Sequence, residues 1–136
     1  MARILAVDSD PHYIGAYSEA LDTHDLYSAI DSDEALRHLA GIRVDLIITD
    51  YELLRSNIDF INYAGNKKVI VTTPYESPQG LEEALSELRG RIPFEHFQKP
   101  SKPAVAGLER GEIIKRLAQG LSPGLPRLVN EMLANR

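Results

Sequence analysis

Residues 45–50 read Asp-Leu-Ile-Ile-Thr-Asp, and this stretch decides the fold. With Val44 before it, the run is apolar nearly throughout. Such a run is typical of a central strand in a parallel sheet, because both faces of that strand are buried. We therefore expect a central strand over residues 44–49, ending at the carboxylate of Asp50.

On either side of this strand, short apolar runs alternate with amphipathic stretches, the pattern of βαβ units and a parallel sheet. Further strands are expected over residues 4–7, 26–30, 69–71 and 92–98, the last less apolar and therefore at an edge. Helical spacing predicts five helices, through residues 14–21, 35–40, 58–64, 81–88 and 113–121. Ser32, or Asp31 before it, can cap the second helix. The fold class is α/β.

Composition excludes several kinds of protein. A chain of 136 residues fits one domain. Its net charge of -5 argues against nucleic acid or an anionic membrane as a direct partner, since both attract basic surfaces. The absence of cysteine excludes disulfides and thiolate catalysis. No signal peptide precedes the first strand and no apolar run is long enough to span a bilayer, so the expected location is the cytoplasm.

The last fifteen residues differ from the rest. Residues 122–126 read Ser-Pro-Gly-Leu-Pro, a cluster that ends helices, and a short apolar stripe follows over residues 125–133. We divide the chain into a domain over residues 1–121 and a C-terminal extension over residues 122–136. The extension is either an extra helix packed on the same domain or a linker or dimer helix. Whether the chain is a whole protein or a piece of a larger one is also open.

Polar side chains close four of the predicted strands. They are Asp8, Asp50, Thr73 and Lys99. Open α/β sheets bind ligands in the crevice beyond the carboxyl ends of their strands. The sequence therefore predicts one polar site at that edge of the sheet.

This ordered set, within Val-Asp-Ser-Asp-Pro at 7–11 and Phe-Gln-Lys-Pro at 97–100, resembles the receiver domain of two-component response regulators. The resemblance covers roughly residues 2–120. It implies a doubly wound, flavodoxin-like sheet of five parallel strands in the order 2-1-3-4-5. It also implies a signalling protein, not a metabolic enzyme, whose partners are a histidine kinase or phosphotransfer protein and a downstream output protein or domain. Signalling would use the face of the fourth helix, fifth strand and fifth helix, and a homodimer is compatible with it.

The resemblance assigns a role to each matching residue. Asp50 is the phosphoacceptor. Asp8 matches the first acid of the family's acidic pair, and with Asp50 and the backbone carbonyl of Glu52 it would hold Mg²⁺. Lys99 and Thr73 match the groups that contact the phosphoryl oxygens.

Two further positions match by place in the chain. Pro100 matches a structural proline that in the family often follows a cis peptide bond. His96 takes the place of a switching Tyr or Phe. It could play the same part with sensitivity to pH, or be an exposed strand histidine without that role.

Ser9 departs from the family, because the second acid that touches the metal normally stands there. Asp10 is adjacent, but it lies on the wrong side of the turn unless the turn rearranges. Either Asp8 and Asp50 hold Mg²⁺ weakly, with Ser9 or Asp10 as a further ligand, or the domain is not phosphorylated. Two further departures fall on signalling loops. Pro74 follows Thr73, and the stretch between Asp50 and Thr73 is short, which requires a short or partly unwound third helix. A degenerate receiver that binds a partner constitutively is therefore the rival hypothesis.

A distant alternative is a cobalamin-binding domain. Residues 10–15 match Asp-x-His-x-x-Gly, in which His12 would bind cobalt. The accompanying motifs argue against it, since the Ser-x-Leu sequence falls at residues 86–88 in a predicted helix and no Gly-Gly pair occurs. His12 is then expected to be an exposed residue in the first turn of a helix.

Overall fold

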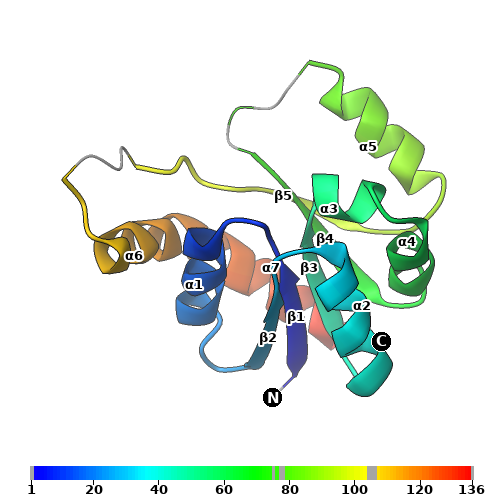
Figure 1. Ribbon diagram of the computed structural model, residues 1–136, viewed down its shortest axis with the longest axis horizontal. Helices are drawn as coiled ribbons and strands as arrows, with labels where there is room; N and C mark the ends of the chain where they lie inside the picture. The colour runs from blue at the N-terminus through cyan, green and yellow to red at the C-terminus, as the bar shows by residue number, and fades with distance from the viewer. Residues whose placement is uncertain (1, 75, 77–78, 104–106, 136) are drawn as a thin grey trace.

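A computed structural model of the protein describes residues 2–74, 76, 79–103 and 107–135. Five parallel strands form one sheet in the order β2-β1-β3-β4-β5, which confirms the predicted topology (Figure 1). The strands are β1 (Arg3–Val7), β2 (Asp25–Ala29), β3 (Leu46–Asp50), β4 (Lys68–Thr73) and β5 (Glu95–Gln98). Their bounds lie within a few residues of the predicted ones, and β5 lies at an edge as expected.

Seven helices are found in the described residues, not five around the sheet and one in the extension. They are α1 (Pro11–Ala20), α2 (Ser32–Gly41), α3 (Tyr51–Arg55), α4 (Ile58–Ala64), α5 (Leu81–Arg89), α6 (Arg110–Leu121) and α7 (Gly124–Ala134). The prediction of five flanking helices is wrong because α3 was missed. Asp31, not Ser32, caps α2 by accepting a hydrogen bond from the N–H of Glu34.

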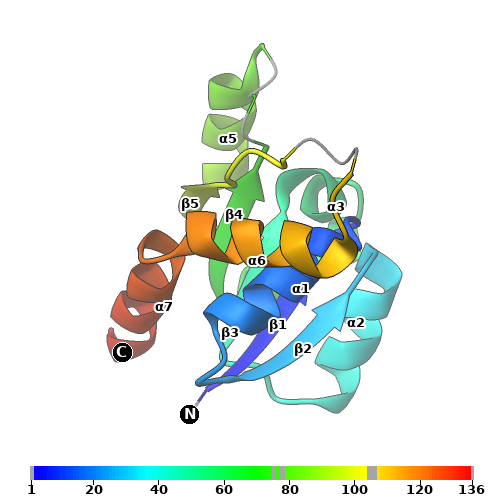
Figure 2. The same cartoon turned by 90° about the vertical axis from the view of Figure 1, so that its left-hand side faces the viewer.

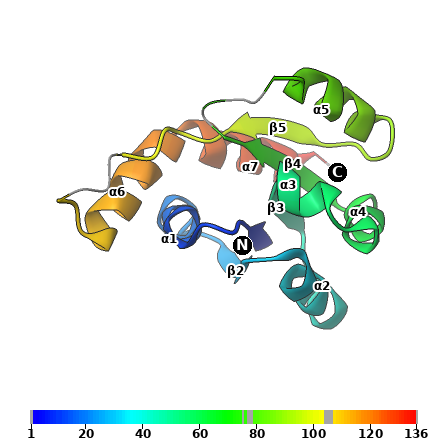
Figure 3. The same cartoon turned by 45° about the horizontal axis from the view of Figure 1, so that its top comes forward.

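The sheet separates two cores, and the alternation of side chains along β1 shows how. Ile4 and Ala6 face α1, α6 and α7, whereas Leu5 and Val7 face α2, α4 and α5. Figure 3 shows α1 and α6 on one side of the sheet and α2 and α4 on the other. Both faces are covered, which explains why the middle positions of the central strands β1, β3 and β4 are apolar.

The extension at residues 122–136 contains α7, which packs on the first of these cores (Figure 2). Leu125 and Val129 are fully buried there. The Lys68 ammonium, at the start of β4, donates to the carbonyl of Met132 at 2.6 Å and to that of Asn135. A cation at this end of a helix satisfies carbonyls that have no partner within the helix. The domain boundary at residue 121 stays a prediction.

None of the helices in the described ranges combines the length and the apolar character needed to cross a bilayer.

Candidate functional site

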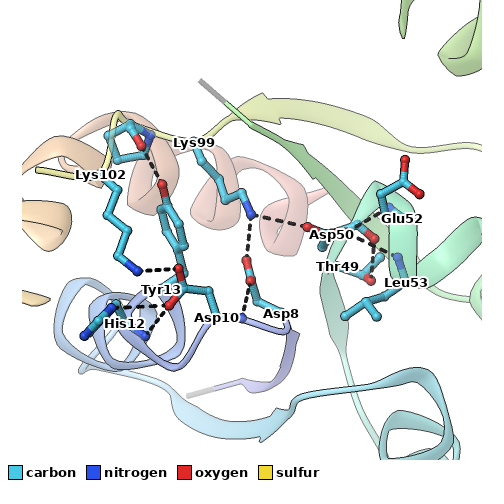
Figure 4. Close-up of polar contacts among 11 residues, drawn as sticks. Asp8, Asp10, His12, Tyr13, Thr49, Asp50, Glu52, Leu53, Lys99 and Lys102 are labelled. Atoms are coloured by element: carbon cyan, nitrogen blue, oxygen red, sulfur yellow. Dashed lines mark hydrogen bonds and ion pairs between the residues drawn. The ribbon is translucent and has the colours of Figure 1, made fainter. Parts of the chain in front are cut away.

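Asp8, Asp50 and Lys99 meet at the carboxyl edge of the sheet, from three different strands (Figure 4). Lys99 Nζ lies 2.9 Å from Asp8 Oδ2 and 3.3 Å from Asp50 Oδ2. The Lys99 and Asp8 side chains are 6% and 1% exposed, and that of Asp50 is 15% exposed. One ammonium therefore bridges two carboxylates, and of these two carboxylates Asp50 is the more exposed to solvent.

The turn after β1 fixes Asp8. The Asp8 N–H donates to the carbonyl of Ala29 on β2, and Asp8 Oδ1 accepts the Asp10 N–H at 2.9 Å. An Asp side chain that bonds the backbone two residues on is a common turn device. Asp10 then caps α1 by accepting the His12 N–H, and Pro11 occupies the first helical position.

Asp50 also caps the helix α3, which begins at the next residue. Its Oδ1 accepts the N–H groups of Glu52 and Leu53 at 2.8 and 3.2 Å, while Oδ2 faces Lys99. These bonds fix the carboxylate orientation and explain why a helix begins directly after β3. The Glu52 carbonyl accepts the Ser56 N–H within α3, so its role toward a metal stays a prediction.

The buried charges shift the pKa values of the two most buried groups. Burial raises the pKa of Asp8 above its usual range, and the Lys99 charge opposes part of that effect. Burial alone would lower the pKa of Lys99, but the charges and hydrogen bonds of Asp8 and Asp50 outweigh it and raise that pKa. Lys99 is therefore a fixed cation at neutral pH.

Asp10 is turned away from this cluster. Its Oδ2 binds Lys102 Nζ at 2.8 Å, and its Oδ1 caps α1 and lies 3.4 Å from His12 Nδ1. Burial acts to raise the pKa of Asp10, but the bond from Lys102, the His12 N–H and the Lys102 charge together hold it below the usual range. The expectation that Asp10 lies on the wrong side of the turn agrees with this geometry. Ser9 is exposed.

Thr73 and His96 form a pair on the neighbouring strands. Thr73 is fully buried, and its Oγ1 lies 2.6 Å from His96 Nε2. Strand pairing aligns Asp50 with Thr72, which places Thr73 one residue beyond the level of Asp50 in the sheet. The Lys99 N–H donates to the Thr73 carbonyl, so the pair is linked to the lysine through the backbone. His96 is half-buried and bonded, not a free strand histidine.

This pair predicts a pH-dependent stability. Burial, with a smaller effect of Arg89 opposed by Glu82, lowers the pKa of His96. The unfolded chain then binds a proton more readily than the folded one, so the free energy of unfolding falls as the pH drops below about 6.5. Urea unfolding at a series of pH values from about 8 to about 5, on both sides of the usual histidine pKa of about 6.5, measures this fall in stability. His96→Phe is the control, and an unchanged pH dependence in that variant would contradict the assignment to His96.

Two carboxylates, from Asp8 and Asp50, fit a magnesium ion, which is often held by one or two carboxylates with waters completing its shell. The described residues contain no group of three or more histidine or acidic side chains that could hold a metal. Ser9 supplies no charge, and the single positive charge of Lys99 is already paired with both carboxylates. The residues present therefore suit a magnesium ion in competition with Lys99.

Two residues at this site were not predicted from the sequence, Tyr13 and Lys102. The Tyr13 hydroxyl donates to the Pro100 carbonyl at 2.8 Å, and Lys99 Nζ lies 4.5 Å from the centre of the Tyr13 ring. Tyr13 lies one residue before the helix predicted at residues 14–21, so helical spacing assigned it no role. Nothing in the sequence pointed to Lys102 as a site residue except its position three residues after Lys99.

The peptide bond before Pro100 is trans, whereas the cis bond found in the described chain precedes Pro123. The cis bond that the resemblance implied before Pro100 is therefore not found, and a trans bond is the ordinary preference for a residue followed by proline. His12 lies in the first turn of α1 as predicted, but its side chain is 22% exposed and faces Asp10, so it is less exposed than expected.

A comparison with models of protein families finds no match, and a comparison with curated protein sequences finds none either.

Solved structures do resemble this one. A response regulator receiver domain protein from Clostridium thermocellum is similar with a TM-score of 0.59 and 19% identity, over 95% of this chain and 99% of that one. The signal receiver domain of an HD domain-containing protein from Pseudomonas fluorescens Pf-5 gives 0.60 and 21%, over 88% and 94%. A response regulator protein from Thermotoga maritima in complex with Mg²⁺ and BeF gives 0.54 and 23%, over 86% and 99%. The chain thus has the fold of response regulator receiver domains, as its strand-end residues predict.

Proposed function

We propose that the chain is a receiver domain of two-component signalling that accepts a phosphoryl group on Asp50. The observation that carries the proposal is the position of Lys99 Nζ between the carboxylates of Asp8 and Asp50. A purely structural ion pair would need one carboxylate, whereas a phosphoryl acceptor needs a partly exposed carboxylate beside a fixed cation. The Asp50 side chain has that exposure and Asp8 does not.

The chemistry follows from these groups. A carboxylate oxygen of Asp50 attacks the phosphorus of a phosphohistidine on a histidine kinase or phosphotransfer protein, the P–N bond breaks, and the donor imidazole keeps the electron pair and takes up a proton. The product is an acyl phosphate. Lys99 stabilises the charge on the transferring oxygens, and Thr73 supplies a hydroxyl once its bond to His96 rearranges.

Magnesium completes this proposal. When bound between Asp8 and Asp50 it would neutralise phosphoryl charge, with Lys99 moving toward the phosphoryl group. The binding is weak in this chain because Ser9 is neutral and Lys102 holds Asp10.

Restoring an acid at position 9 is expected to strengthen magnesium binding. A new unit charge a few ångströms from a divalent ion gains more than its desolvation costs, and we expect Ser9→Asp to bind Mg²⁺ about tenfold more tightly. Calorimetric titration measures the affinity. Ser9→Asn is the matched neutral control, and an equal gain in both variants would contradict the charge argument.

The proposal is tested by incubation with Mg²⁺ and a small phosphodonor such as acetyl phosphate or phosphoramidate, followed by intact mass measurement. We expect one phosphoryl adduct on the wild type and none on Asp50→Asn, a substitution that preserves the size and the capping ability of the side chain. The proposal fails if the wild type takes up no adduct, or if Asp50→Asn takes up as much.

The rival function is an interaction module that does not depend on phosphorylation. Two observations favour it, the absence of an acid at Ser9 and the ion pair that occupies Asp10. A wild type without adduct that still binds its partner would support this function.

The rest of the proposal follows from the receiver role. We place the domain in the cytoplasm, with an output protein or domain docking on the face of α5, β5 and α6, and with self-association as a further route of output. Nucleic acid is not a partner of this domain, and its activity is limited to its own phosphorylation and dephosphorylation.

A further inference from the structure

Tyr13 makes two contacts with the segment that carries the active lysine (Figure 4). Its side chain leaves the first turn of α1, and the residue is 8% exposed. The hydroxyl donates to the Pro100 carbonyl at 2.8 Å, and Lys99 Nζ lies above the ring, 4.5 Å from its centre. One aromatic side chain thus holds both the head of Lys99 and the backbone of the next residue.

Each contact has a defined physical effect. An ammonium above the face of an aromatic ring is attracted by the ring quadrupole, and the attraction grows when water is excluded, as it is around this buried lysine. The hydroxyl is a reliable donor at neutral pH, because burial raises the pKa of Tyr13 against the opposing effect of Lys99. The ring orients the ammonium, and the hydrogen bond fixes the strand end from which Lys99 projects.

We infer that Tyr13 is the positioning residue for Lys99, holding its ammonium over the acidic turn so that it reaches both Asp8 and Asp50. The role in phosphoryl transfer rests on the proposed function, whereas the placement of Lys99 does not. Tyr13 acts on the site through Lys99.

A second contact strengthens the same arrangement. Lys102, three residues after Lys99, binds Asp10 at 2.8 Å. Asp8, Asp10 and Tyr13 all belong to the turn after β1 or the first turn of α1, so the segment from Lys99 to Lys102 is tied to that region at three points. The turn that contains Ser9 is thus held to the lysine segment by an aromatic ring and by ion pairs.

The placement of Lys99 is tested by NMR on the unphosphorylated protein. Protons above an aromatic ring are shifted upfield, so the ε-methylene and ammonium protons of Lys99 should be shifted upfield in the wild type. Tyr13→Phe keeps the ring and should keep the shift, whereas Tyr13→Met fills the space without a ring and should lose it. The control is Tyr17→Met, which removes another buried ring of α1, one that lies beside Thr72 of β4. A Lys99 shift that survives in Tyr13→Met, or that is lost equally in Tyr17→Met, overturns the inference.

The consequence for phosphoryl transfer is tested by the rate of adduct formation with the small phosphodonor. We expect Tyr13→Met to be about tenfold slower and Tyr13→Phe to stay within about threefold of the wild type. If Tyr13→Met does not fold, a fluorinated phenylalanine at position 13 keeps the shape while weakening the quadrupole, and it should be slower than Tyr13→Phe. Equal rates for these two aromatic side chains would overturn the positioning role.

The two tests separate the two ideas. A wild type that takes up no phosphoryl group defeats the proposed function, while the Lys99 shifts still decide whether Tyr13 places the lysine. A wild type that is phosphorylated, with Tyr13→Met as fast as wild type, keeps the function and defeats the inference.

Discussion

Lys99→Met is expected to lower the free energy of unfolding by about 3–5 kcal/mol at neutral pH, because removing one partner of a buried ion pair leaves the other charge uncompensated. Here one ammonium serves two carboxylates, and Asp8 is only 1% exposed. Methionine has nearly the length of lysine, so the variant removes the charge with little change of packing. Chemical unfolding in urea measures the loss.

The sign of the pH dependence distinguishes this explanation from a loss of packing. Burial already raises the pKa of Asp8, and removal of Lys99 removes the main effect that opposes it. A carboxyl whose folded pKa is raised binds its proton more tightly in the folded state, so the folded state of the variant is favoured as the pH falls toward that pKa. The deficit of Lys99→Met should therefore be largest at neutral pH and smaller in mild acid.

The matched control adds Asp8→Asn to Lys99→Met. Once the buried charge is gone, a large part of the lost stability should return at neutral pH. A deficit of Lys99→Met that is independent of pH, and is unchanged by Asp8→Asn, would show that the lysine contributes packing and not charge.

Leu125→Ala is expected to cost about 2–5 kcal/mol, the usual range for emptying a fully buried leucine site. Leu125 is fully buried in the core that also contains Ile4, Leu46 and Ile70 of the sheet. A linker or a dimer helix would not lose stability in this way. The measurement is urea unfolding of the variant at two protein concentrations.

Leu128→Ala is the matched control on the same helix, since Leu128 is only partly buried against that core. It should cost clearly less than Leu125→Ala. Equal and small losses in both variants, below about 1 kcal/mol, would place α7 outside the folded core and restore the linker interpretation of residues 122–136.

The sheet and its polar edge could be predicted from the sequence because they depend on local patterns. The apolar run of β3 is fixed by burial on both faces. Asp50 is the last residue of β3, Lys99 directly follows β5, and the pattern marks both strand ends. The parallel topology then brings these side chains to one edge without any further information.

The remaining features depend on contacts between segments distant in sequence. The helix α3 exists because Asp50 caps it with bonds to Glu52 and Leu53. In the sequence, Asp50 was interpreted as the phosphoacceptor, and no helix was predicted directly after it. Tyr13 and Lys102 act on residues 87 and 92 positions away, Pro100 and Asp10. No periodicity in a single sequence reports such pairs, and Tyr13 precedes the residues from which the first helix was predicted.

The most direct test of the central claim is to map the phosphoryl adduct to a residue. After incubation with the small phosphodonor and Mg²⁺, reductive trapping and peptide mass spectrometry should place the adduct on Asp50, and hydroxylamine should release it, as expected of an acyl phosphate. An adduct on a serine, threonine or histidine, or a wild-type protein that takes up no phosphoryl group, would contradict the account.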